Sequence, residues 1–357
     1  MQILSAASAF PKHYYSQQTL LTALRTYWAG ELDRPETLDR LHLRAGVDGR
    51  YLAYPLQDYY KMQTFGDFNR AWAKAAVELG SQALCQALIQ ANFAPSDIDA
   101  IFFVSVTGVC SPSIDAKLVN RMKLSPHIKR IPIFGLGCVA GAAGIARCAD
   151  YVRAFPGQVA ALVSVELCSL TLQKKDLSVA NLISSGLFGD GAAAVIVYGG
   201  DPGEAGPGAE IIATQSTFYP NSEDVMGWDI SERGFQIVLS PSVPEVIREH
   251  LGHDVDTFLA GQNLTRQDIS SWIMHTGGPK VLEASQDALG VGREALQISW
   301  DCLARTGNLS SASVLCVLEQ VMKQPPPPGA YSVLAAAGPG FCSELVLLKW
   351  GEPRLPQ

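Results

Sequence analysis

The chain has 357 residues, of which 48% are hydrophobic and 17% charged. That is enough apolar material for a large core and too long a chain for one simple core, so we expect two domains or a duplicated fold. The net charge of −7 and the pI near 5.4 argue against a nucleic-acid partner, which favours a basic surface.

The eight cysteines form no C-x-x-C pair and are scattered through apolar segments. This usage indicates reduced, mostly buried thiols and a cytoplasmic protein. The N-terminus lacks the basic start and long apolar stretch of a signal peptide. No uncharged apolar run is long enough to cross a bilayer, so we expect no membrane span.

Strands and helices alternate in the first half of the chain, as judged from apolar spacing and from glycine and proline breaks. The predicted elements are a helix at 75–92, a buried strand at 98–106, the end of a buried strand at 131–134, a helix at 138–154, a strand at 159–165, a loop-rich stretch from 172, a turn at 188–191 and a strand at 192–198.

A glycine- and proline-rich linker at 199–208 separates a second half of similar style, giving predicted halves at 1–200 and 209–357. The elements predicted there are a strand ending at 272–275, helices at 280–289 and 310–322, a loop at 325–329, and strands at 331–337 and 344–350. The alternation in both halves predicts an α/β architecture with a hint of internal duplication.

One cysteine lies in tight, glycine-rich backbone, in the run Phe134-Gly-Leu-Gly-Cys138-Val-Ala-Gly-Ala-Ala-Gly144. It stands between a predicted strand and a predicted helix, where the positive end of the helix dipole lowers the pKa of a thiol. Small neighbours also leave backbone N–H groups free to bind an oxyanion. The alternative is that Cys138 is a small buried hydrophobe, as most free cysteines are.

Two further motifs place polar side chains at element junctions. His275 ends a strand in Met274-His275-Thr-Gly-Gly-Pro279-Lys280, and Asn308 lies on a tight turn in Arg305-Thr-Gly307-Asn308-Leu-Ser-Ser-Ala312. Histidine can take the proton of a cysteine near neutral pH, and an amide can donate to a developing oxyanion or enolate. Singly, the two are typical of a structural histidine and a turn residue. Together with Cys138 they indicate an active site.

These motifs, with the tract Gly186-Leu-Phe-Gly-Asp-Gly-Ala-Ala-Ala194, closely resemble the type III polyketide synthases, the chalcone synthase superfamily. The resemblance covers nearly the whole chain. Within the superfamily, the tracts at 135–150 and 164–173 look most like the bacterial alkylpyrone and alkylresorcinol synthases. The resemblance implies a thiolase fold of five layers, αβαβα, with two similar halves. It also implies a homodimer that holds no metal and no organic cofactor.

The resemblance implies roles for the three residues. Cys138 would carry an acyl starter from coenzyme A as a thioester, and His275 and Asn308 would bind the malonyl thioester carbonyl and promote decarboxylation. The substrates would be an acyl-CoA and malonyl-CoA. A likeness to the alkylpyrone and alkylresorcinol synthases favours a long fatty acyl starter. A thiolate–imidazolium pair would keep Cys138 charged at rest.

Further substrate-binding residues are implied by the same resemblance. Phe188 matches the gatekeeper phenylalanine between the coenzyme A tunnel and the cavity, and Phe235 matches the second. Their alternative role is ordinary core packing. Arg40 and Arg44 fall where the family places basic residues for the coenzyme A phosphates, a group that arginine suits.

Ring closure in plant members depends on a threonine, a glutamate and a serine. Glu166 and Ser310 match the last two, whereas the threonine position is Val106, so that one hydroxyl is lost. Cys168 and Thr171 occupy cavity-lining positions. These residues leave open whether the chain closes by aldol condensation to a resorcinol or by lactonisation to a pyrone.

Other readings of the chain remain open. It could be a type III synthase that uses a malonyl or aromatic starter, or a ketosynthase III-like fatty-acid enzyme of the same fold, loaded from a carrier protein. It could also be an inactive acyl-binding scaffold or a cysteine hydrolase. The intact trio argues against the scaffold, and the acyl-loading motifs argue against the hydrolase.

Overall fold

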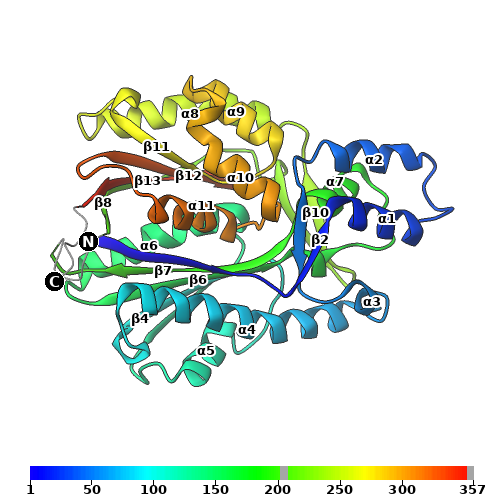
Figure 1. Cartoon of the computed structure of the whole chain (residues 1–357), viewed down its shortest axis with the longest axis horizontal. Helices are drawn as coiled ribbons and strands as arrows, with labels where there is room; N and C mark the ends of the chain where they lie inside the picture. Colours follow the sequence, from blue (N-terminus) through cyan, green and yellow to red (C-terminus); the bar gives the residue numbers. More distant parts are fainter. Residues whose placement is uncertain (202–207, 352–357) are drawn as a thin grey trace.

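The computed structural model describes residues 1–201 and 208–351 of the chain. Figure 1 shows five layers, in which two groups of strands alternate with three groups of helices. This is the αβαβα arrangement that the sequence resemblance implied. Most of the predicted linker, residues 202–207, lies outside the described residues.

Nine strands form one hydrogen-bonded series. In the order of the sheet they are β11 (Ile269–Met274), β12 (Tyr331–Gly338), β13 (Cys342–Trp350), β8 (Ala209–Phe218), β1 (Gln2–Ala9), β7 (Asp190–Tyr198), β6 (Val159–Leu167), β4 (Ala100–Val104) and β5 (Lys129–Ile133). The two halves meet where β1 pairs with β8, through Gln2 and Ile3 alone. Because this junction is short, the strands on its two sides lie in separate layers (Figure 1).

The helices fall into three layers and one end group. The lower outer layer in Figure 1 contains α4 (Phe65–Ala91) and α5 (Ile114–Met122), and the upper outer layer contains α8 (Val243–Ala260) and α9 (Pro279–Leu289). The middle layer contains α6 (Ala140–Ala154) and α11 (Ala312–Lys323). Helix α10 (Gln297–Thr306) precedes α11. Helix α4 begins with a capping box between Thr64 and Asp67, which satisfies backbone donors at its exposed end.

The middle layer is built from small and apolar residues because it is covered on both faces. Ala140, Ala142 and Ile145 of α6 are all buried, and so are Val314 and Leu318 of α11. They belong to one core cluster that also contains residues of the strands on both sides. Alanine-rich helices allow this close approach of helix to helix and of helix to strand.

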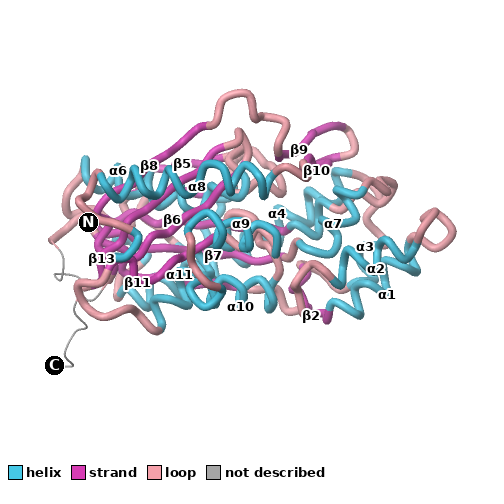
Figure 2. Tube along the Cα trace, turned by 90° about the horizontal axis from the view of Figure 1, so that it is seen from above, coloured by secondary structure: helices cyan, strands magenta, loops and turns pink. Residues whose placement is uncertain are grey.

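One end of the molecule, on the right of Figures 1 and 2, carries the remaining short elements. These are α1 (Gln17–Tyr27), α2 (Pro35–Leu43), α3 (Leu56–Tyr59) and α7 (Val179–Leu187), with the paired strands β2 (His13–Ser16) and β3 (Gly49–Leu52), and β9 (Met226–Ser231) and β10 (Gly234–Leu239). The N-terminus lies at the opposite end (Figure 2).

Two predictions from the sequence are wrong. The loop-rich stretch from Leu172 contains helix α7, whose start is capped by the side chain of Ser178. The strand ending at 131–134 is β5, which lies at the edge of the sheet, so its side chains are not buried and Phe134 is 50% exposed. Both errors concern apolar residues whose surroundings come from distant parts of the chain.

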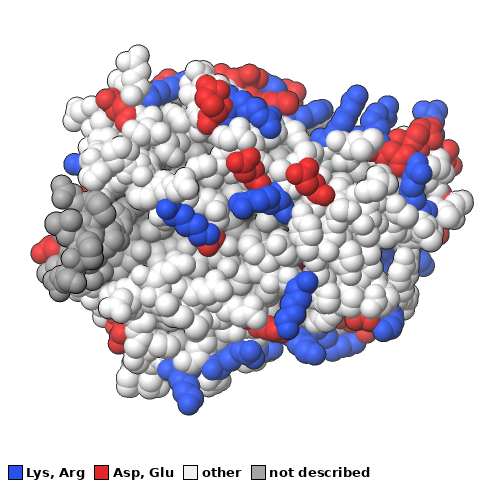
Figure 3. Space-filling model, viewed as in Figure 1, with Lys and Arg blue, Asp and Glu red and all other residues white. Residues whose placement is uncertain are grey.

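The face of the molecule seen in Figure 3 mixes lysine and arginine with aspartate and glutamate, and much of its middle is uncharged. The charges on this face therefore provide no extended basic area of the kind that binds nucleic acid. Among the helices of the described residues, none is long and apolar enough to cross a membrane.

Candidate active site

Cys138 lies at the start of the middle layer. A single 3₁₀ turn, Gly137–Val139, precedes α6, and the cysteine side chain is only 6% exposed. Gly137 has a φ of +52°, and a Cβ atom there would lie 2.7 Å from Cδ of Pro339. The turn thus requires glycine both for its left-handed backbone and for the approach of the loop after β12.

Asn308 is held by backbone hydrogen bonds to the end of α7. Its N–H donates to the carbonyl of Leu187 at 2.9 Å, and its carbonyl accepts from the N–H of Gly189 at 3.0 Å. The side-chain oxygen of Asn308 accepts from the N–H of Ser310 at 2.7 Å. Because that oxygen is occupied, the amide nitrogen is the end of the side chain that remains for the cavity.

His275 follows the last residue of β11. Its N–H donates to the carbonyl of Ala335 at 3.0 Å, and its own carbonyl accepts from Gly277 at 3.0 Å, so the backbone is fixed on both sides. The ring is buried, and Nδ1 has no hydrogen-bond partner in the described part of the chain. An imidazole without a fixed partner can exchange a proton with a substrate or a neighbouring thiol.

The structure brings Cys138, His275, Asn308 and Phe188 to the wall of one cavity, the catalytic cavity, with about 760 Å³ of space including the part open to solvent. The rest of its wall is mainly apolar and comes from α8, α9 and the strands β12 and β13. A space of this size and character suits an acyl chain or the arm of a thioester. The motif of Cys138 lies more than 130 residues before those of His275 and Asn308, yet the three motifs form one site.

Burial dominates the acid–base properties of the site. It raises the pKa of Cys138 to about 12, against the smaller lowering effects of hydrogen bonds from Ser310 and Asn308. It also lowers the pKa of His275 to about 4. The lowering of the thiol pKa expected from the helix terminus is therefore outweighed. A lone thiolate or a lone imidazolium is disfavoured, whereas the pair formed together neutralises its own charge.

Glu166 is fully buried, and hydroxyl and N–H groups surround it. Its Oε2 accepts from the N–H of Val106 at 3.1 Å and from the hydroxyl of Thr107 at 2.9 Å, while Oε1 accepts from the hydroxyl of Ser311. Burial still raises the pKa of Glu166 to about 7. Ser310 instead accepts a weak hydrogen bond from Cys138, with Sγ and Oγ 3.6 Å apart.

The network around Glu166 also contains Ser105, Thr107 and Ser311, which were not predicted as site residues from the sequence. Each of them carries a hydroxyl group next to an apolar residue, and this pattern is the feature by which the sequence could have indicated it. The hydroxyl absent at Val106 is supplied to Glu166 by the neighbouring Thr107. The polar group around the glutamate is therefore complete, although its members differ from those that the resemblance implied.

The other predicted residues are more dispersed. Phe188 and Cys168 line a second cavity, described below, and Phe188 separates it from the catalytic cavity. Phe235 is buried in an aromatic cluster with Phe65, Phe134 and Trp228, and neither cavity includes it in its wall. The same holds for Thr171, whose hydroxyl donates to the carbonyl of Cys168 at 2.8 Å.

Arg40 and Arg44 are exposed at the end of α2. Within the described residues, neither forms an ion pair, so both guanidinium groups are available to an anion. The following turn passes the start of α9, because a Cβ on Gly46 would lie 2.9 Å from Cγ of Pro279. This contact lies two residues after Arg44 and two residues after Gly277, which is part of the wall of the catalytic cavity.

The described residues contain no group of three or more histidine, cysteine, aspartate or glutamate side chains that could hold a metal ion. The catalytic cavity presents a thiol, an imidazole and an amide. These three groups suit acyl transfer from a thioester, because they supply a nucleophile, a base and a donor to an oxyanion.

Comparison with known proteins agrees with this geometry. Two family models match, chalcone and stilbene synthases N-terminal domain over residues 3–202 and the C-terminal domain over residues 210–350. A 1,3,6,8-tetrahydroxynaphthalene synthase from Streptomyces peucetius is 47% identical over 350 residues, which cover 98% of this chain and 93% of the relative. A putative chalcone synthase from Bacillus subtilis is 34% identical, with 98% of both chains covered.

Among solved structures, the 1,3,6,8-tetrahydroxynaphthalene synthase of Streptomyces coelicolor superposes with a TM-score of 0.93 at 31% identity. The match covers 99% of this chain and 100% of that structure. That structure is a bacterial type III polyketide synthase, which confirms the thiolase fold. Such enzymes act on coenzyme A thioesters without a further cofactor. The chain therefore belongs to the chalcone and stilbene synthase family, the type III polyketide synthases, which are transferases that catalyse the decarboxylative condensation of malonyl-CoA.

Proposed function

We propose that this synthase builds an aromatic polyketide from malonyl-CoA alone, with 1,3,6,8-tetrahydroxynaphthalene as its product. The observation that carries the proposal is the similarity to the Streptomyces peucetius enzyme of that name, with nearly half of the residues identical along almost the whole of both chains. A malonyl starter was one of the alternatives that the sequence left open. It here replaces the fatty acyl starter as the first hypothesis.

In this proposal Cys138 attacks the starter thioester, and coenzyme A leaves as its thiol. His275 takes the thiol proton as the sulfur attacks, so that no lone charge forms in the dry cavity. His275 returns that proton to the leaving coenzyme A thiolate. The free amide nitrogen of Asn308 and the ring N–H of the neutral His275 then bind the carbonyl oxygen of the next malonyl thioester. Carbon dioxide leaves, and the negative charge that develops on that oxygen is stabilised in the transition state.

The enolate attacks the acyl carbonyl on Cys138 and forms the new carbon–carbon bond. The chain is thereby returned to coenzyme A, and the cycle repeats. Phe188, on the wall of both cavities, separates the incoming thioester from the space for the growing chain. Arg40 and Arg44, exposed and free of ion pairs among the described residues, bind the coenzyme A phosphates.

A fatty acyl starter with closure to an alkylpyrone or alkylresorcinol is the second candidate function. One observation favours it, namely the apolar side chains of α1 in the wall of the second cavity, including Leu20 and Leu24. An alkyl chain entering this space would bury apolar surface at about 25 cal/mol per Å². The same cavity contains cationic groups, however, which an alkyl chain does not use.

The test is incubation of the purified enzyme with uniformly carbon-13-labelled malonyl-CoA, with and without unlabelled fatty and aromatic acyl-CoAs. We expect malonyl-CoA alone to give tetrahydroxynaphthalene with every carbon labelled, detected by mass spectrometry. A product that forms only when an acyl-CoA is added, and that carries its unlabelled carbons, contradicts the first function. If the acyl group is a fatty one, that result supports the second function.

A further inference from the structure

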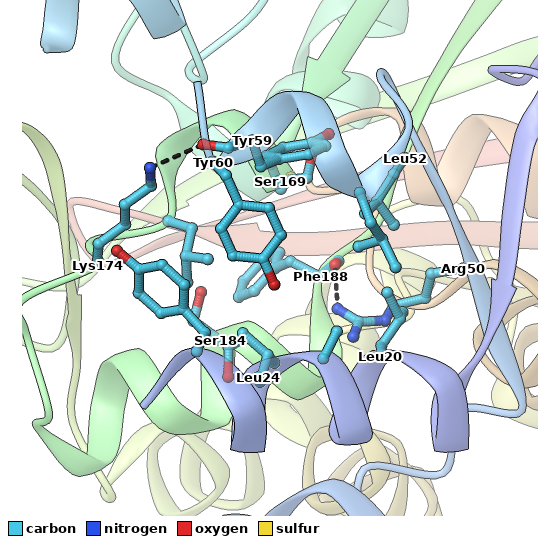
Figure 4. Close-up of a pocket in the computed structure, with 16 residues that line it drawn as sticks. Leu20, Leu24, Arg50, Leu52, Tyr59, Tyr60, Ser169, Lys174, Ser184 and Phe188 are labelled. Atoms are coloured by element: carbon cyan, nitrogen blue, oxygen red, sulfur yellow. Dashed lines mark hydrogen bonds between the residues drawn. The ribbon is translucent and has the colours of Figure 1, made fainter. Parts of the chain in front are cut away.

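A second cavity lies on the other side of Phe188, between α1, α3 and the loop before α7 (Figure 4). We name it the end cavity, since it belongs to the group of short helices at one end of the molecule. Its wall is largely apolar, yet Arg50 and Lys174 both contribute to it, from opposite sides (Figure 4). No aspartate or glutamate is part of the wall among the described residues.

Arg50 is the unusual group in this wall. It is 4% exposed, and of its five N–H donors only one makes a hydrogen bond in the described structure, from Nη1 to the carbonyl of Phe188 at 2.7 Å. Its Nε is buried without a partner. Burial lowers the pKa of Arg50 to about 10, still high enough that the guanidinium is charged at neutral pH.

Asp190, the carboxylate that acts on Arg50, accepts its hydrogen bonds from other groups. Asp190 raises the pKa of Arg50, but the two form no ion pair within 4.0 Å. The carboxylate of Asp190 accepts instead from the N–H groups of Ala53 at 2.6 Å and Ser169 at 2.8 Å. A buried cation with unused donors and no direct counter-ion is costly unless an anion binds to it.

Lys174 adds a second positive charge, but unlike Arg50 it uses most of its hydrogen-bond donors within the protein. Its ammonium group donates to the carbonyls of Tyr59 at 2.7 Å and Met62 at 2.6 Å, so two of its three donors are used. Lys174 is therefore held in place as part of the wall, and its charge raises the potential of the cavity for anions. Arg50 is the group with donors left to bind one.

The end cavity also lies close to the nucleophile. Phe188 lies in the wall of both cavities, and Cys168 forms part of the wall of the end cavity. Cys138 in the catalytic cavity, Phe188 in the wall of both cavities, and Arg50 in the end cavity thus mark a line from one cavity into the other. A chain attached to Cys138 can grow along this line.

We propose that Arg50 binds the terminal carboxylate of the chain carried on Cys138. The inference rests on the proposed function, because a malonyl starter leaves a carboxylate at the far end of the polyketide. Elongation moves that end away from Cys138 and toward the end cavity. The guanidinium presents unused donors to the carboxylate, and the apolar wall surrounds the rest of the chain.

The test is competition between adipoyl-CoA, which ends in a carboxylate, and hexanoyl-CoA, which ends in a methyl group, for acylation of Cys138. Intact-protein mass spectrometry measures the ratio of the two acyl-enzymes. We expect Arg50→Gln to lower the adipoyl-to-hexanoyl ratio about tenfold or more, and Arg50→Lys to retain part of it. If Arg50 only holds Phe188 in place through the carbonyl of that residue, its replacement would instead slow both acylations and leave their ratio unchanged.

A second pair of variants leaves Arg50 intact, in case its replacement prevents folding. Ser184 lies in the wall of the end cavity (Figure 4). A carboxylate introduced there competes for the guanidinium, so Ser184→Glu should lower the ratio, whereas the matched Ser184→Gln should not. The proposal is overturned if the adipoyl-to-hexanoyl ratio is the same in the wild type, in Arg50→Gln and in Ser184→Glu. Since neither acyl-CoA is the proposed starter, this result is independent of whether malonyl-CoA alone gives product.

Discussion

At the scale of single residues, burial controls the charge that Cys138 and His275 can carry. In the proposed mechanism Cys138 acts as the nucleophile in acyl loading, and the imidazole of His275 binds the malonyl carbonyl. Neither side chain can take a charge by itself in the dry cavity, as the pKa shifts of both show. Loading is therefore expected to need both Cys138 and His275, whereas decarboxylation needs His275 and Asn308 but not the thiol.

Substitution of the two residues tests this division. We expect Cys138→Ala to abolish acylation and polyketide formation, while malonyl-CoA decarboxylation continues because His275 and Asn308 remain. His275→Gln should lower the decarboxylation rate by about 10²–10³-fold, the usual loss on removing one oxyanion donor. Carbon dioxide release from labelled malonyl-CoA measures the second activity. An unchanged rate in His275→Gln would remove the histidine from this role.

Glu166 makes stability depend on pH. Its pKa is about 7 in the folded chain, against an ordinary 4.5, so the folded state retains a proton that the unfolded state has lost. Stability therefore falls as the pH rises from about 4.5 to 7, by about 3 kcal/mol in total for this group. Glu166→Gln should flatten this dependence, as measured by urea unfolding at a series of pH values.

Asp190 provides the internal control for that experiment. Its pKa is raised to about 6 by burial, so it contributes a loss of stability in the same direction. This loss should persist in Glu166→Gln. A variant whose stability still varied with pH as strongly as the wild type would show that Glu166 ionises normally.

At the scale of elements, the approach of α6 to α11 sets the position of the nucleophile. A Cβ on Gly141 would lie 2.2 Å from the carbonyl oxygen of Ser311 at the start of α11. Glycine at this position therefore lets the helix carrying Cys138 reach the turn carrying Asn308. The start of α11 also brings Ser311 to Glu166 of β6.

Gly141→Ala should push these helices apart. We expect the free energy of unfolding to fall by about 1–3 kcal/mol, as for overpacked sites, and the condensation rate to fall with it. The matched control is Gly227→Ala in β9, where a Cβ would meet nothing within 4 Å. Thermal and urea unfolding compare the two variants. A Gly141→Ala enzyme as stable as the control would contradict a packing role.

The elements that the sequence predicted well are those whose pattern is local. Alternation and glycine breaks located β6, β7, β12 and β13 to within a few residues. Helix α7 was missed because its short apolar run lies among serines, and its packing against α2 and β10 comes from distant segments. The exposure of β5 depends on its place at the sheet edge, which no local pattern encodes.

At the scale of the whole molecule, the catalytic trio could be predicted because each member lies in a motif with its own glycine and proline signature. The side chains that surround the trio could not be predicted in the same way. Thr107 reaches Glu166, and Lys174 joins Arg50 in the wall of the end cavity, only because the fold brings separate segments together. The pKa of Cys138 follows the burial that the fold imposes and not the nearby helix terminus.

The whole-molecule prediction concerns the unpaired edge of the sheet. Strand β5 is the last of the nine and has no neighbour on one side in the described chain, and the residue after it, Phe134, is 50% exposed. An exposed strand edge with an adjacent aromatic side chain favours pairing with another chain. We therefore expect a homodimer, with twice the 38.3 kDa of one chain in light scattering after size exclusion.

Phe134→Asp tests whether this edge forms the interface. The new charge would have to be buried against the partner, so we expect the mass to fall toward that of one chain, in a concentration-dependent manner. The control is Ile89→Asp on the outer helix α4, where the side chain is 72% exposed and a charge remains in water. Ile89→Asp should leave the mass unchanged. A dimer that tolerates aspartate at residue 134 as well as at residue 89 would place the interface on another face of the molecule.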